Sequence, residues 1–102
     1  MKTENSKKNK KSVNQIYLRA IEMVTGTSKL TEKQSKALIF YVKETMRRLH
    51  CCVLWNRDEQ FLELLSSVGI SRDSIGRREV IINERYELLY SRDYKKFIPK
   101  AV

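Results

Sequence analysis

The stretch that most constrains the fold covers residues 30–53, because it contains neither glycine nor proline. Thr31 is followed three residues later by Gln34, the spacing of a capping box in which each side chain bonds the backbone N–H of the other residue. Residues that suit a core then recur every three or four positions and share one helical face: Leu38, Val42, Thr45, Met46, Leu49 and Val53. We therefore predict a long amphipathic helix at the centre of the core, ending near Leu49 or continuing to Trp55.

The opposite face of this helix is basic and contains one aromatic ring: Lys33, Lys36, Phe40, Lys43 and Arg47. An aromatic ring among cations is typical of proteins that stack a splayed base of RNA or single-stranded nucleic acid while the cations hold phosphates. The alternative is that Phe40 packs against a neighbouring helix or subunit and that the lysines are only solvated.

The chain is expected to form one domain with a basic extension. Residues 1–11 are rich in lysine and nearly devoid of apolar side chains, so we predict a disordered arm before a single globular domain at 12–98 and a tail at 99–102. Ser12 begins a second capping-box spacing, and Gly26 suits the end of the helix that follows. The buried stripe of this first helix is predicted to be Val13, Ile16, Tyr17, Ala20, Ile21 and Val24.

The second half of the domain combines a third helix with a change of period. Asn56 is a good N-cap, Gly69 can end the helix, and its apolar face is broad: Phe61, Leu62, Leu64, Leu65 and Val68. Apolar side chains alternate along residues 77–91, which favours two short strands joined by a turn at Asn83-Glu84 over a further helix. The predicted fold class is mainly α with a C-terminal β-hairpin in one small domain.

Residues 61–78 contain a motif as well as a helix. Gly69 is followed by Ile70 and Ser71, which can cap a further short helix that contains Ile75. The segment resembles the helix-turn-helix of DNA-binding repressors and resolvase-type recombinases, in which the second helix enters the major groove. The resemblance implies groove and phosphate contacts by Arg72, Ser74, Arg77 and Arg78, and a winged-helix-like arrangement in which the hairpin is the wing.

Two positions depart from the pattern of that family. Leu65 stands where the family has a small residue, and Gly76 weakens the second helix by about 1 kcal/mol relative to alanine. The alternative reading of the segment is an ordinary corner between helices, with arginines that are only solvated.

The positive charge is concentrated at the two ends of the chain. The net charge is +9, of which residues 1–12 contribute +4, residues 91–102 contribute +3 and residues 13–90 contribute +2. Basic ends favour a polyanion such as nucleic acid over an acidic lipid surface. The candidate nucleic-acid contacts are Lys7, Lys8, Lys10, Lys11, Lys36, Lys43, Arg47, Arg72, Ser74, Arg77 and Arg78.

Other functional classes find little support in the residues. Cys51 and Cys52 are adjacent, which suits neither a disulfide framework nor, with His50, a zinc site, so we predict a reducing cytoplasm, a buried Cys52 and a half-exposed Cys51. No nucleophile–base pair or phosphate loop is found, and no apolar run is long enough for a membrane span. We expect no enzyme activity, no metal and no cofactor.

The sequence therefore predicts a small intracellular nucleic-acid-binding protein. DNA is preferred because of residues 61–78, and a regulator of transcription or replication from a phage or plasmid fits the size. A homodimer is expected, since strands within 80–90 offer more apolar surface than one small domain needs to cover: Val80, Ile82, Tyr86, Leu88 and Tyr90. The alternatives are an RNA-binding protein that uses Phe40, and a protein–protein interaction adaptor with residues 86–90 as its docking edge.

Overall fold

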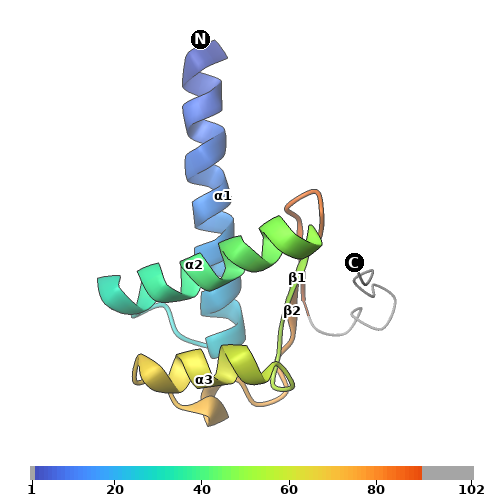
Figure 1. The fold of residues 1–102 in the computed structure, drawn as a ribbon. Helices are drawn as coiled ribbons and strands as arrows, with labels where there is room; N and C mark the ends of the chain where they lie inside the picture. The colour runs from blue at the N-terminus through green and yellow to red at the C-terminus, as the bar shows by residue number, and fades with distance from the viewer. Residues whose placement is uncertain (1, 91–102) are drawn as a thin grey trace.

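A computed structural model describes the backbone of residues 2–90 and the side chains of residues 13–89. Over this range the elements are the helices α1 (Lys2–Thr25), α2 (Glu32–Leu49) and α3 (Glu59–Ser67), the 3₁₀ turn η1 (Arg72–Ser74), and the strands β1 (Cys52–Leu54), β2 (Val80–Ile82) and β3 (Leu88–Tyr90) (Figure 1). The prediction of a mainly helical domain with a C-terminal hairpin is confirmed.

Helix α2 begins as the sequence predicts. The Gln34 N–H donates to the Thr31 hydroxyl at 3.1 Å, and the Thr31 N–H donates to the Gln34 side chain at 2.9 Å, which completes the capping box. The helix ends at the earlier of its two predicted ends, because His50 adopts a left-handed φ of 62° and the chain then enters β1. Of the predicted buried face, Leu38, Val42, Thr45 and Met46 are buried, whereas Leu49 is partly buried and Val53 belongs to β1.

Helix α1 differs from the prediction at its start. It begins at Lys2 rather than after Ser12, so residues 2–11, predicted as a disordered arm, are the first turns of the helix and project beyond the rest of the fold (Figure 1). Nothing in that segment stops a helix, since it lacks glycine and proline and lysine favours helix. The predicted stripe is confirmed, with Tyr17, Ala20, Ile21 and Val24 buried and Val13 and Ile16 partly buried.

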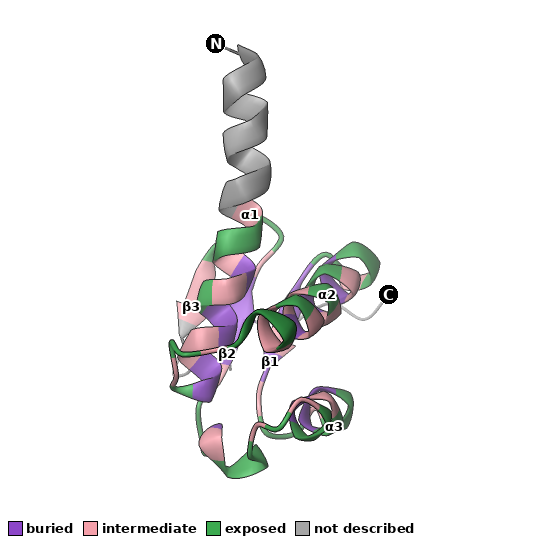
Figure 2. Cartoon of the chain, turned by 90° about the vertical axis from the view of Figure 1, so that its left-hand side faces the viewer, coloured by how far each residue is buried: buried purple, intermediate pink, exposed green. Residues whose placement is uncertain are grey.

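The core lies between the C-terminal half of α1, helix α2 and the sheet, and α3 closes it from below (Figures 1 and 2). Two polar contacts align α3 antiparallel to α2. The Tyr41 hydroxyl near the middle of α2 bonds Asp58 at the start of α3, and the Gln34 side chain donates to the Val68 carbonyl at 2.8 Å. These contacts fix α2 from its inner side between its first turn and its middle.

The three strands form one antiparallel sheet in the order β1-β2-β3. The hairpin is confirmed, with Ile81 opposite Leu89, and its turn includes the predicted Asn83-Glu84 but continues to residue 87, so Tyr86 lies in the turn and not in a strand. The Asn83 side chain organises this turn by accepting from the backbone N–H groups of residues 85 and 87. All three residues of β2 are buried within one chain, whereas Tyr86 in the turn is exposed, so the homodimer stays a prediction.

Helix α3 ends as predicted and begins two residues later than predicted. Asp58, not Asn56, is the N-cap, because its carboxylate accepts from the N–H of residue 61 at 3.2 Å. Gly69 takes a φ of +82°, and the Ile70 N–H donates to the Leu65 carbonyl at 2.8 Å, which closes the helix.

Over its described residues, the structure does not contain the second helix that the helix-turn-helix resemblance implied after Gly69. Ser71 does cap the next element, but that element is η1, a single 3₁₀ turn of three residues. The chain cannot continue as a helix because Gly76 takes a φ of +56° while the buried Ile75 anchors the turn to the core. The second helix that would enter a major groove is therefore not formed, and a winged-helix arrangement does not follow from these elements.

Candidate nucleic-acid interface

The outer face of α2 carries the five side chains that the sequence places there. We call the set formed by Lys33, Lys36, Phe40, Lys43 and Arg47 the α2 face; all five are exposed. Phe40 lies at its centre and is 64% exposed, so the alternative in which its ring packs against a neighbouring helix of the same chain is wrong. Fourteen residues of helix separate the first and last members, so the face is about 21 Å long.

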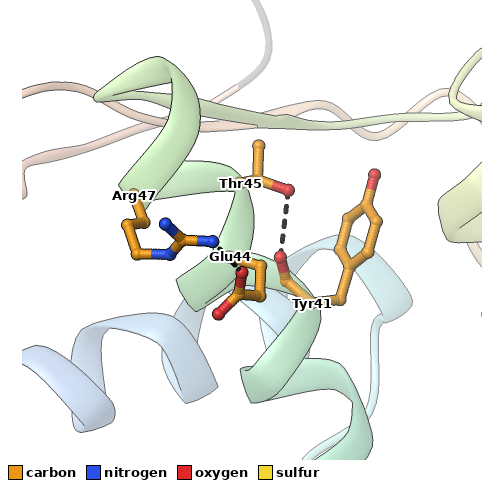
Figure 3. A network of polar contacts seen from close by, with 4 residues as sticks. All are labelled: Tyr41, Glu44, Thr45 and Arg47. Carbon is orange, nitrogen blue, oxygen red and sulfur yellow. Dashed lines mark hydrogen bonds and ion pairs between the residues drawn. The ribbon is translucent and has the colours of Figure 1, made fainter.

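Two carboxylates moderate the charge of the α2 face. Lys36 pairs with Glu32 at 3.4 Å within the helix surface. Arg47 pairs with Glu44 at 2.6 Å (Figure 3). The hydrogen bond from Arg47 lowers the pKa of Glu44. Such exposed pairs contribute little energy, so an incoming phosphate can compete for both cations.

The inner side of α2 holds the face in place through a polar network. The Tyr41 ring stacks on Phe61 at 5.6 Å between ring centroids, and its hydroxyl bonds Asp58. The Thr45 hydroxyl donates to the Tyr41 carbonyl at 2.9 Å, on the side of the helix away from the Glu44–Arg47 pair (Figure 3). Because Tyr41 follows Phe40 directly, this network fixes the backbone that carries the exposed ring.

Two buried groups and one partly buried group make the fold sensitive to alkaline pH. Burial, followed by the charge of Asp58, raises the pKa of the Cys52 thiol to about 12. Burial and the neighbouring Tyr86 raise the pKa of Tyr17 to about 12, and burial with the Asp58 hydrogen bond raises that of Tyr41 further. Each group thus holds its proton more tightly in the folded than in the unfolded chain.

We predict that the free energy of unfolding falls as the pH rises from 9 towards 12. A raised pKa gives stability that is complete below the unfolded value and is lost as the unfolded chain releases protons that the folded chain retains. Urea unfolding at pH 8, 9.5 and 11 in the presence of a reductant measures this loss. The Cys52→Ala variant should show a shallower decline, and a midpoint that does not change between pH 8 and 11 would contradict the assignment.

Most of the residues predicted to contact a DNA groove form ion pairs or hydrogen bonds within the protein. Arg72 pairs with Glu59 at 3.4 Å, the Ser74 hydroxyl donates to a carbonyl of its own turn, and the Arg78 guanidinium lies over Gly26 and donates to the Ser74 carbonyl at 2.6 Å. Arg77 is exposed. Their segment packs below α3, on the side away from α2 in Figure 1, so the structure does not unite these residues with the α2 face.

The predicted contacts at the chain ends are only partly within the described range. Lys7, Lys8, Lys10 and Lys11 belong to the first turns of α1 by their backbone, and their side chains lie outside the described part. The C-terminal basic segment, residues 91–102, also lies outside it.

The sequence analysis did not predict one aromatic–cation pair. The guanidinium carbon of Arg57 lies 5.8 Å from the centre of the Trp55 ring, in the connection between β1 and α3. The signal was the presence of an aromatic and a cation two residues apart, but this spacing alone does not indicate that they meet.

The comparisons and the remaining side chains do not add another candidate. Both Cys51 and Cys52 are buried free thiols, which corrects the prediction that Cys51 is half-exposed. Among the described residues no group of three or more histidine, cysteine or acidic side chains is arranged to hold a metal ion. No helix in the described range has the length and apolar character needed to cross a membrane. Compared with known protein families, curated proteins and solved structures, the chain matches none of them.

Proposed function

We propose that this protein binds nucleic acid through the α2 face. The observation that carries the proposal is the exposure of Phe40, a large apolar ring at the centre of a row of four cations. The fold buries Phe61 completely but exposes Phe40, so the apolar ring of Phe40 is available to a ligand. A nucleobase supplies the complementary flat surface, and its phosphates supply the complementary charge.

Single-stranded nucleic acid, or an RNA loop, suits this face better than a duplex. A base can stack on Phe40 only when it is turned out of its helix, as in single strands and loops. The sequence-based preference for duplex DNA depended on a second helix after Gly69, and that segment forms only η1.

Duplex binding by a regulator of transcription or replication is the alternative. It is favoured by one feature, since α2 is an eighteen-residue helix with an exposed basic side, and an α-helix fits the major groove of DNA. A third possibility, an adaptor that binds an acidic protein segment, uses the same cations and requires no nucleobase.

The test is a titration of fluorescently labelled single-stranded RNA, single-stranded DNA and duplex DNA at 50 and 200 mM salt. Four phosphate contacts on a single strand give a slope near −2.8 in a plot of log affinity against log salt, so the fourfold change in salt should weaken binding about 50-fold. We expect both single strands to bind more tightly than the duplex. The reverse order supports the duplex alternative, and an affinity that ignores salt contradicts nucleic-acid binding.

Phe40→Ala should weaken single-strand binding by about 1–3 kcal/mol, the usual contribution of one base–aromatic stack. Phe40→Tyr is the matched control, because it keeps the ring and should bind as the wild type does. The thermal midpoint of both variants should be unchanged, since the side chain packs into no core. Equal binding by Phe40→Ala and the wild type would remove the ring from the proposed site.

A further inference from the structure

The connection between β1 and α3 is joined to the turn that follows η1. The Asn56 side chain donates to the Gly76 carbonyl at 3.0 Å, across twenty residues of sequence. Trp55 and Arg57 flank Asn56, and Arg77 follows Gly76. One hydrogen bond therefore brings an aromatic residue and two arginines from separate segments to the same place.

The charges in this place are available to an external anion. Arg57 and Arg77 are both exposed, and neither forms an ion pair with another described side chain, whereas nearby Arg72 is paired with Glu59. The Arg57 guanidinium lies against the half-buried ring of Trp55. An aromatic ring with a guanidinium on it offers a flat surface on which a base can stack.

The connection between β1 and α3 is also bonded to the inner side of α2. The hydrogen bond between Tyr41 and Asp58 links the two elements, and Phe40 and Arg57 are the residues immediately before these partners. Because residues 72–78 lie on the side of α3 away from α2 in Figure 1, a flexible strand that stacks a base on Phe40 must extend over several nucleotides to reach this second aromatic–cation pair.

We propose that Trp55, Arg57 and Arg77 form a second contact for the single strand bound on the α2 face. The two arginines hold phosphate, for which a guanidinium has the matching planar hydrogen-bonding geometry, and a base stacks on the Trp55–Arg57 pair. This inference rests on the proposed function, because it extends the same ligand across a second part of the surface.

Trp55 makes the second contact observable separately from the first, since it is the one tryptophan in the sequence. Binding is measured by the anisotropy of a labelled oligouridine, and the second contact by the emission of Trp55 in the same titration. A twelve-nucleotide strand should change the tryptophan emission, whereas a three-nucleotide strand, which is too short to occupy both places, should bind more weakly and leave the emission closer to that of the free protein.

Arg57→Ala and Arg77→Ala should each weaken binding of the twelve-nucleotide strand several-fold and lower the salt slope by about 0.7. Arg85→Ala is the matched control, because Arg85 is an exposed arginine on the hairpin turn and belongs to neither contact. Both arginine variants should keep the wild-type thermal midpoint, since these side chains are exposed.

The outcomes separate this inference from the proposed function. If anisotropy shows binding that depends on Phe40, while the emission is constant and both variants bind as Arg85→Ala does, the second contact is overturned and the α2 face remains. If no labelled strand binds at any salt concentration, the proposed function fails and the second contact fails with it.

Discussion

Phe61→Ala is expected to lower the free energy of unfolding by about 3–5 kcal/mol, the usual cost of removing a buried phenylalanine. The ring is 0% exposed and lies in the first turn of α3, where it stacks on Tyr41 of α2. Its loss leaves a cavity between two helices that are otherwise joined mainly by side-chain contacts. A domain of this size has about 5–15 kcal/mol in total, so the variant should lose a large share of its stability. Urea denaturation followed by circular dichroism measures the change.

Phe40→Ala provides the comparison for the same substitution on the outer side of the neighbouring helix. Because the Phe40 ring is 64% exposed, its removal should change the free energy of unfolding by less than about 0.5 kcal/mol. A comparable loss in both variants would mean that Phe40 is buried in solution, for instance against a second copy of the chain. That result would also oppose its role as a stacking ring.

The helical part of the fold was predictable because its signals are local. The capping box of Thr31 and Gln34 and the three-to-four-residue spacing of the buried stripe lie within one segment, and the structure has both where the sequence placed them. The same holds for Gly69, since a helix end that requires a positive φ strongly favours glycine. The hairpin was predictable from its alternation and its turn residue Asn83.

The parts that the sequence did not predict depend on distant partners. Strand β1 has only three residues, too few for a period, and it exists because its backbone pairs with β2 nearly thirty residues later. The segment after Gly69 has good helix-capping chemistry, yet burial of Ile75 and the positive φ of Gly76 outweigh it. Local propensity is a weak guide where tertiary contacts decide the conformation.

The candidate site also has a part that the sequence predicted and a part that it did not. The α2 face follows from helical periodicity, so its members could be predicted from the sequence alone, whereas the exposure of Phe40 could not, because a ring at this position can also pack against a neighbouring helix. The place formed by Trp55, Arg57 and Arg77 could not, because it depends on the bond between Asn56 and Gly76. Arg78 shows the converse: it was predicted to contact DNA, and it lies instead over a glycine fifty-two residues earlier in the sequence.

Gly26→Val is expected to lower the free energy of unfolding by about 2–4 kcal/mol. Valine is strained at the left-handed φ of this position, and its side chain would also displace Arg78. The φ of Gly26 is +74°, and an added Cβ would lie 2.8 Å from Nη1 of Arg78. The arginine can move away, but it then gives up its 2.6 Å hydrogen bond to the Ser74 carbonyl. This contact joins the end of α1 to the turn that follows η1.

Gly69→Val separates the two causes, because Gly69 has a similar φ of +82° and open space where its Cβ would lie. It should cost only the backbone strain, about 1–3 kcal/mol, and so about 1 kcal/mol less than Gly26→Val. Adding Arg78→Ala to each variant tests the origin of the difference in a double-mutant cycle. The Arg78→Ala change should be less damaging beside Gly26→Val than alone, and additive with Gly69→Val. Additivity in both backgrounds would show that Arg78 does not hold the end of α1 to this turn.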